Sequence, residues 1–424
     1  MKIFENLKLK FIKDTIWLYF SFLVFLVSGL AINLIILFSH GIDDLGVFIQ
    51  IYTIYLIWSQ FSTFGIHDSA QRHVAYYITD KKVLNQIKLG AILNGIFLGL
   101  FFSVGLYFFA ETIGETVQSS AVGIGLKLIS PAILFFSLNK ILLSILNGER
   151  KIRLYSISQS LRSFLLLLFV IWISLNYRDS YNLAFSFLIT EFILSAFLLF
   201  FINIKPFLNA STKQLIYWTK FHLVFGFKSF PIGFLYESYL KIDILMLSIF
   251  LTDKNVGMYS FAAMFFEGVY QIPHIIKTNV NPVLVSIMKK ENKIKIDKFI
   301  KSLFLMTIII TSLCLVIIIS IYPFLNSLFP NNLIRDTYFI IILLSFGLLF
   351  YSGFIPFDFI FLQAGKPLTQ TFLLLINTGA NIGLNFLFIP SYGIYGAAIA
   401  TSLSLILSGI TLYIFMSVLN FIAK

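Results

Sequence analysis

Four basic side chains lie inside long apolar runs of this chain, where a charge is costly. They are Lys277, Lys241, Arg162 and Lys140. A charge at the centre of a bilayer costs about 2.5–3.5 kcal/mol on insertion scales, so such a residue usually faces a cavity or a partner of opposite charge. Arg binds an oxyanion through two parallel hydrogen bonds, and Lys acts as a movable point charge. We therefore predict that these four residues, in that order of preference, line a cationic cavity. Snorkelling explains Arg162 and Lys140 equally well.

Three acidic side chains accompany these cations. Glu237 lies four residues before Lys241, with Asp243 close by, and Glu267 lies in the next apolar run. A carboxylate in an apolar setting can carry a proton, so these three are the predicted coupling or gating residues. A self-neutralised structural cluster of Glu237, Lys241 and Asp243 is an equally good interpretation.

Uncharged polar residues recur at helical spacing in the second and eighth apolar runs. Such a stripe lines a cavity or makes interhelical hydrogen bonds worth about 0.6–2 kcal/mol each. The cavity interpretation is favoured because the second stripe shares its face with Lys277 and Glu267. The predicted polar cavity residues are Gln60, Thr63, His67, Gln271, His274 and Asn281.

Signatures of catalysis are not found in the sequence. It contains no phosphate-binding glycine loop, no cluster at metal-ligand spacing and no nucleophile paired with a base. We expect no catalytic residues, no metal and no cofactor, with H⁺ or Na⁺ as the candidate coupling ions.

The apolar runs that carry these residues indicate an all-α, polytopic membrane protein. Of 424 residues, 58% are hydrophobic and only 12% are charged, against roughly a quarter charged in soluble domains. A membrane-spanning helix needs about 20 apolar residues. Twelve spans are predicted near residues 14–38, 46–66, 88–110, 122–146, 155–176, 181–204, 222–250, 256–285, 300–322, 336–362, 368–389 and 393–418.

The basic residues predict the orientation of these spans. With both termini cytoplasmic, the outside loops hold only Arg178, Lys254 and Arg335, plus Lys127 just inside a helix. Most other Lys and Arg residues then lie inside, as the positive-inside rule requires. The formal charge of +12 therefore reflects topology, and no nucleic-acid partner is expected.

Two internal correspondences favour a duplicated unit of six helices. The stretch from Leu45 aligns with that from Val256, and the turn around Gly148 aligns with that around Gly365. Parallel repeats are common in secondary transporters. We predict an N-terminal lobe at 1–210 with spans 1–6 and a C-terminal lobe at 211–424 with spans 7–12.

Two segments carry a family resemblance. GFLYESYLKIDILMLSIFLTDKNVGMYSFAAMFFEGVYQIPHIIKTNVNPVLV (233–285) and LQAGKPLTQTFLLLINTGANIGLNFLFIPSYGIYGAAIATSLSLI (362–406) resemble polysaccharide-export flippases. These are Wzx-type proteins of the polysaccharide transport family, in the multidrug/oligosaccharidyl-lipid/polysaccharide (MOP) superfamily. The similarity is spread over the chain.

The resemblance implies a fold and a function. The fold is two six-helix lobes forming a V around a central cavity. The function is alternating-access transfer of undecaprenyl-pyrophosphate-linked O-antigen or capsule repeat units to the outer leaflet of the bacterial inner membrane. Pyrophosphate would then be the anion that the four cations bind. Membrane lipid, a polysaccharide polymerase and a chain-length regulator are the other partners implied.

Three alternatives stay open. Multidrug exporters of the superfamily often carry an Asp in span 1, where this chain has only Asn33, and lipid II flippases have two further C-terminal helices beyond a position corresponding to Lys424. A glycan polymerase or ligase usually has a large outside loop, whereas the longest predicted here is about a dozen residues. The flippase is therefore the leading hypothesis.

Overall fold

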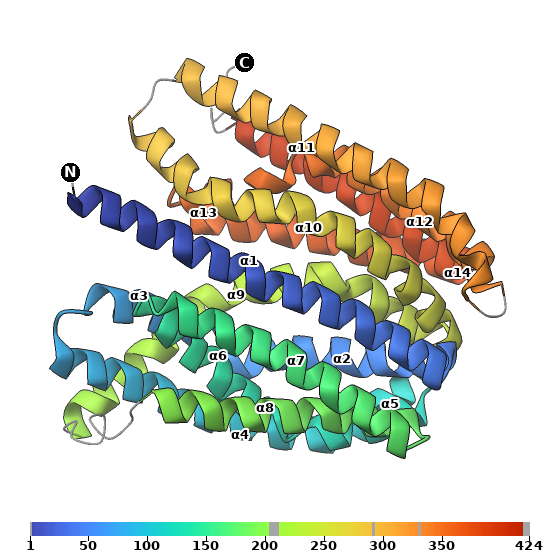
Figure 1. Cartoon of the computed structure of the whole chain (residues 1–424), viewed down its shortest axis with the longest axis horizontal. Helices are drawn as coiled ribbons and strands as arrows, with labels where there is room; N and C mark the ends of the chain where they lie inside the picture. The colour runs from blue at the N-terminus through green and yellow to red at the C-terminus, as the bar shows by residue number, and fades with distance from the viewer. Residues whose placement is uncertain (1, 203–211, 291–292, 330–331, 419–424) are drawn as a thin grey trace. The chain divides into compact units, whose positions relative to one another are not determined.

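The computed structural model of the chain describes residues 2–202, 212–290, 293–329 and 332–418 (Figure 1). The described residues form helices and short connections, without a strand among them. The helices are α1 (Lys2–Ser39), α2 (Ile42–Thr63), α3 (Ile66–Tyr76), α4 (Lys81–Thr116), α5 (Ser120–Ile129), α6 (Ala132–Gly148), α7 (Ile152–Asn176), η1 (Ser180–Leu183), α8 (Ala184–Phe201), α9 (Thr212–Phe250), α10 (Asp253–Lys290), α11 (Lys293–Ile321), η3 (Tyr322–Ser327), α12 (Leu333–Ser352), η4 (Ile355–Phe357), α13 (Ile360–Gln363) and α14 (Pro367–Val418).

Eight helical segments in the described part are long and apolar enough to cross a membrane. They are α1, α2, α4, α7, η1 with α8, α11 with η3, α12 and α14. The pair α5 and α6, bent by 53°, adds a ninth. These findings confirm the predicted all-α polytopic membrane protein, while the number of twelve spans stays a prediction.

The helices and the predicted spans can be compared at several places. The predicted span at 122–146 is broken at Ser130 and Pro131, between α5 and α6. The predicted span at 336–362 ends at Ser352, and η4 and α13 follow it. The last two predicted spans lie in α14, in which two helices meet at a kink at Gly393, where the prediction separates them. Gly393 has φ 57° and ψ −133°, a backbone conformation open essentially to glycine alone.

The chain divides into two compact units, Met1–Phe234 and Leu235–Lys424. The boundary falls inside α9, so one continuous helix contributes its first half to the N-terminal unit and its second half to the C-terminal unit. The predicted lobe boundary between residues 210 and 211 stays a prediction.

The N-terminal unit is built around α4 and α6. Both pack against each other, and α3 and α8 pack on α6, so their apolar faces form one core with Trp218 of α9. The Asp80 carboxylate begins α4 by accepting hydrogen bonds from the backbone N–H groups of Lys82 and Val83, at 3.1 and 3.2 Å, as an N-cap does. In the same unit α1 packs along α7.

The C-terminal unit is built around α10, α12 and α14. These helices pack against one another, and η4 lies on α10. Two apolar clusters fill their contacts, one around Phe357 and Phe361 and the other around Tyr270 and Tyr351. The second cluster encloses the polar site described next.

Candidate functional site

A buried ion pair forms the centre of the polar site in the C-terminal unit. Lys277 of α10 lies 3.6 Å from Asp358, measured from Nζ to Oδ2, and Asp358 follows η4 directly. Lys277 is only 2% exposed. The predicted cation Lys277 therefore points into its unit and not toward lipid.

Hydrogen bonds hold Asp358 from two sides. The Tyr351 hydroxyl donates to Asp358 Oδ1 at 2.5 Å, and the Gln370 side-chain amide donates to the Asp358 backbone carbonyl at 2.8 Å. A buried carboxylate needs such partners in addition to its counterion, because its desolvation is costly.

Aromatic rings cover Lys277. Its Nζ lies 4.7 Å from the ring centroid of Tyr236 and 4.1 Å from that of Phe359, and it donates to the Tyr236 hydroxyl at 3.3 Å. Both rings are within the range of cation–π attraction, which is stronger when the cation is desolvated. The ammonium group is thus surrounded by one carboxylate and two aromatic faces.

A small cavity adjoins the pair. Its volume is about 20 Å³, which is room for about one water molecule. Tyr236, Tyr270, Asp358 and Gln370 are among its lining residues. The Gln370 side-chain oxygen is buried without a hydrogen-bond partner among the described residues. A volume of about 20 Å³ is too small for a sugar or a pyrophosphate.

Two further charged groups of α9 bond to α10. Lys241 Nζ donates to Glu267 Oε1 at 2.9 Å, and Asp243 accepts a hydrogen bond of 2.6 Å from the Tyr259 hydroxyl. The ion pair of Lys241 therefore joins two helices, which a cluster confined to the Glu237–Asp243 segment does not predict. Glu237 itself is half-buried.

The remaining polar residues predicted on span 8 belong to α10. Gln271 and His274 are half-buried on the turns that precede Lys277. Asn281 lies in the same helix, but its side chain is outside the described part of the structure. The cavity-lining role predicted for these three stays a prediction.

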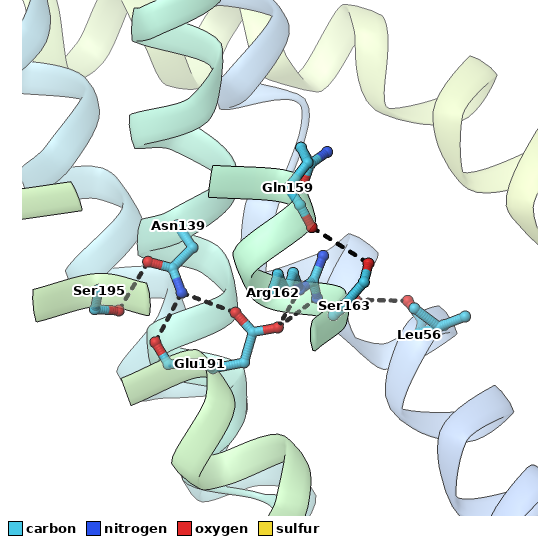
Figure 2. Close-up of polar contacts among 8 residues, drawn as sticks. Leu56, Asn139, Gln159, Arg162, Ser163, Glu191 and Ser195 are labelled. Carbon is cyan, nitrogen blue, oxygen red and sulfur yellow. Dashed lines mark hydrogen bonds and ion pairs between the residues drawn. The ribbon is translucent and has the colours of Figure 1, made fainter. Parts of the chain in front are cut away.

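The N-terminal unit contains an ion pair built on a buried carboxylate. Arg162 of α7 donates from Nε to Glu191 Oε1 of α8 at 2.7 Å, and one Nη group contacts the same oxygen. Asn139 Nδ2 donates to Glu191 Oε2 at 2.8 Å, and the Ser195 hydroxyl donates to Asn139 Oδ1 at 2.8 Å. Figure 2 shows Glu191 between Asn139 and Arg162.

Lys140 of α6 lies close to this pair. Its Nζ donates to Gln60 Oε1 of α2 at 3.0 Å. Lys140 Nζ and Arg162 Cζ lie 5.8 and 4.9 Å from the same ring centroid, that of Phe136. The structure therefore brings together two of the predicted cations with the predicted polar residue Gln60.

The prediction that Gln60, Thr63 and His67 share one continuous helical face was wrong, because the helix is interrupted between Thr63 and His67. Helix α2 ends at Thr63, and Phe64 and Gly65 adopt left-handed conformations before α3 begins. Thr63 donates to the Gln60 backbone carbonyl, whereas His67 lies on α3 beside Asp68, at 3.4 Å. Phe64 has φ 42°, and such a change of chain direction is hard to anticipate from periodicity alone.

Neither carboxylate of these two pairs is among the residues predicted from the sequence. Glu191 and Asp358 each stand alone in an apolar segment, FLITEFILS and IPFDFIF. That isolation was the available signal, because a lone acid in a predicted span needs a cationic partner. Within the described residues, no three His, Cys, Asp or Glu side chains gather as they would to hold a metal ion.

Comparison with known proteins gives the fold. No protein-family model and no curated protein sequence matches the chain. Among solved structures, the lipid II flippase MurJ in an inward closed conformation is similar, with a TM-score of 0.75 and 21% sequence identity over 96% of this chain and 87% of that one. The chain shares the fold of this flippase.

Two further solved transporters share this fold. An inward-facing multidrug resistance MATE family transporter has a TM-score of 0.75 and 14% identity, over 94% of this chain and 96% of that one. A MOP superfamily transporter from Pyrococcus furiosus has a TM-score of 0.64 and 14% identity, over 96% and 95%. All three are transporters or flippases, and identities this low show the fold alone.

Proposed function

We propose that the chain is a flippase that moves undecaprenyl-pyrophosphate-linked oligosaccharide, an O-antigen or capsule repeat unit, from the cytoplasmic to the outer leaflet. The MOP fold and the basic side chains buried at membrane depth in both units support this proposal. A pyrophosphate group carries at least two negative charges, and its passage through lipid requires compensating cations.

The buried pair of Lys277 and Asp358 is the observation that carries the proposal. Replacing both members of a buried ion pair with apolar residues of similar size is often neutral or stabilising, so stability alone does not account for a Lys–Asp pair at this place. An ammonium group that can exchange its carboxylate for a substrate phosphate has a use that Leu or Met lacks. Lys277 therefore alternates between Asp358 and the pyrophosphate during transport.

Proton binding offers a way to couple this exchange to an ion gradient. A proton on Asp358 removes the charge that holds Lys277, and its loss restores the pair. Glu267, Glu237 and Asp243 are further coupling or gating candidates, and the same chemistry applies to each. Coupling to Na⁺ is the competing proposal, distinguished by transport assays with either gradient imposed separately.

The site of action is the bacterial inner membrane, with both termini in the cytoplasm. The distribution of Lys and Arg along the chain supports this orientation. The 1–210 and 211–424 lobes are proposed to alternate access to the substrate. A polysaccharide polymerase and a chain-length regulator are proposed to act on the product at the outer face.

Deletion of the gene tests the function. We expect loss of surface polysaccharide and accumulation of one lipid-linked glycan on the cytoplasmic side, identified by mass spectrometry of extracted lipids. The wild-type gene should restore export, and Lys277→Ala should not, even when its amount in the membrane is matched to that of the wild type. Lys127→Ala is the matched control, because Lys127 pairs with Glu111 at an exposed position. Normal export by Lys277→Ala would remove Lys277 from the mechanism.

Two alternatives follow from the structural similarity. The MATE transporters share the fold at a TM-score of 0.75, which favours a cation-coupled multidrug exporter, and overexpression should then confer drug resistance. The similarity to MurJ favours lipid II as the substrate, and depletion should then stop cell-wall synthesis. Loss of surface polysaccharide without either effect supports the leading proposal.

A further inference from the structure

The first half of α9 has two opposite faces. Trp218 and His222 are buried against α4, where Gly90 lies next to Trp218 and the Ile87 carbonyl accepts a hydrogen bond of 3.0 Å from His222 Nε2. The side chains on the opposite side are exposed. This exposed face of α9 consists of Lys213, Ile216, Tyr217, Lys220, Val224, Phe227 and Lys228. At roughly 100° per residue, the seven residues fall within an arc of about 120°.

The exposed face of α9 combines apolar side chains with cations. Ile216, Tyr217 and Phe227 are 63%, 59% and 68% exposed, and the three lysines are spaced among them. Residues 212–236 contain no Asp or Glu. Aromatic and aliphatic side chains next to lysines on one helical face are typical of a helix in the headgroup region of a membrane, where apolar groups enter the acyl boundary and cations meet phosphate.

A second exposed segment of the same unit lies beside this face. The α3–α4 connection, residues 76–82, exposes 77% of Tyr76 and also exposes Lys81 and Lys82. Its Tyr77 ring lies 5.8 Å from the Trp218 ring of α9, measured between centroids. Figure 1 shows this connection and the start of α9 at the same end of the N-terminal unit. The two segments thus form one surface, although they are far apart in the sequence.

The acids of the α3–α4 region have other partners. Asp80 accepts hydrogen bonds from two backbone N–H groups at the start of α4, and Asp68 lies 3.4 Å from His67. Arg72, which is exposed, lies with its Cζ 5.6 Å from the Phe225 ring of α9 and adds a further cation at the edge of the surface. Cations therefore outnumber acids on this surface, which favours an anionic ligand.

The length of α9 brings this surface to the membrane. The helix has 39 residues, or about 58 Å at 1.5 Å per residue, whereas a bilayer with its headgroups is about 40–45 Å thick. The helix exceeds that thickness even at the average tilt of about 20°. Its first turns therefore reach the headgroup level, and the distribution of basic residues predicts that this is the cytoplasmic side.

We infer that the exposed face of α9, together with the α3–α4 connection, binds anionic phospholipid of the cytoplasmic leaflet. The lysines and Arg72 meet the phosphodiester groups, and Tyr217 and Phe227 enter the acyl boundary. Attraction to an anionic leaflet grows with each Lys or Arg near its surface. An acidic protein suits this face less well, because the centres of protein interfaces are depleted in Lys. The lipid is held and not transported, so the inference does not depend on the proposed substrate.

Titration of the purified full chain in neutral detergent with phosphatidylglycerol, followed by native mass spectrometry, tests this surface. We expect the triple variant Lys213→Gln, Lys220→Gln and Lys228→Gln to bind phosphatidylglycerol at least about tenfold more weakly than the wild type, because three cations leave the face. Binding of phosphatidylcholine should not change, since its headgroup has no net charge.

Two further triple variants separate a local effect from net charge and from folding. Arg178→Gln, Lys254→Gln and Arg335→Gln remove the same charge from exposed positions in the predicted outside loops, and should leave phosphatidylglycerol binding unchanged. Lys213→Arg, Lys220→Arg and Lys228→Arg keep the charge on the face, and should retain binding.

Each result decides for or against the inference. Equal phosphatidylglycerol binding by the wild type and the α9 glutamine variant overturns it, and so does an equal loss in the outside-loop variant. Loss of binding in the arginine variant overturns it as well, because the charge is still present. A wild type that binds soluble polyglutamate more tightly than phosphatidylglycerol assigns the face to an acidic protein. None of these results changes the expected outcome of the gene deletion, so the two proposals fail separately.

Discussion

At the scale of single residues, each unit of the molecule pairs a cation with a buried carboxylate beside aromatic rings. In the C-terminal unit Lys277 meets Asp358 under Tyr236 and Phe359. In the N-terminal unit Arg162 meets Glu191 at the Phe136 ring. Burial strengthens the attraction within such a pair and raises the cost of breaking it. A buried pair therefore serves as a switch only if another anion replaces the carboxylate at the cation, or if a proton neutralises the carboxylate.

Removal of one partner of the Lys277–Asp358 pair should be costly, and removal of both should not. We expect Asp358→Ala to lower the free energy of unfolding by about 3–5 kcal/mol, because it leaves an ammonium buried without its counterion. The double variant K277M/D358L should recover most of that loss, as judged by melting temperature. Export should be lost in both variants. A double variant that exports like wild type would reduce the pair to a structural element.

The ion pairs of Glu149, which lies between α6 and α7, predict a pH dependence. Burial by itself raises the pKa of Glu149, but hydrogen bonds and ion pairs with Lys151 and Lys88 outweigh it and hold the pKa of this carboxyl below its usual range. A lowered pKa in the folded state contributes stability above the ordinary carboxyl range, and this contribution is lost as the pH falls through the lowered value.

Glu149→Gln should therefore lower the melting temperature at neutral pH and lose its effect in acid. Hydrogen bonds to charged groups are worth about 1.5–3 kcal/mol, so the neutral-pH difference should be measurable by thermal unfolding. The exposed Glu115→Gln serves as the control. A difference between Glu149→Gln and wild type that stays constant from neutral to acidic pH would show that charge plays no part in this cluster.

At the scale of elements, the junction between α2 and α3 determines how α9 packs in the N-terminal unit. Gly65 has φ 66°, and a Cβ atom built on it would lie 2.4 Å from Ser229 Oγ and 2.7 Å from the Gly226 carbonyl oxygen, both on α9. Ser229 in turn donates to the Gly65 carbonyl at 3.3 Å. The backbone of the junction therefore touches the backbone of α9, which only a residue without a side chain permits.

Gly65→Ala should destabilise the protein for two reasons. Alanine is strained at positive φ by about 1–2 kcal/mol, and its methyl group would overlap α9, at a typical overpacking cost of about 1–3 kcal/mol. Gly29→Ala is the control, because Gly29 lies within α1 with open space around its Cα. We expect a lower melting temperature for Gly65→Ala only, and equal melting temperatures would contradict the close packing.

At the scale of the whole molecule, the apolar helices and the basic loops together predict a topology that can be measured. Lys82 and Lys366 lie in predicted cytoplasmic loops, Arg178 and Lys254 in predicted outside loops, and all four are exposed. Their positions sample both units of the chain.

Single cysteines at these four positions, in a Cys314→Ser background, should report the orientation. An impermeant thiol reagent added to intact cells should label Arg178→Cys and Lys254→Cys, and should label Lys82→Cys and Lys366→Cys only after the membrane is opened. Cys314 is the only native cysteine, so the background stays low. Labelling of Lys82→Cys and Lys366→Cys from outside would invert the predicted orientation, and a mixed pattern would rule out twelve spans.

The sequence by itself determined the all-α membrane class, because a composition this apolar can satisfy its backbone polar groups in lipid only within helices. It also singled out Lys277 and Arg162, since an isolated charge in an apolar run stands out. Tertiary structure alone decided their partners: Asp358 lies far along the chain from Lys277, and Glu191 lies on a different helix from Arg162. It also decided that α2 ends at Thr63. Helical periodicity reports which residues share a face, whereas pairing and chain reversal depend on how separate helices pack, which one chain's spacing does not encode.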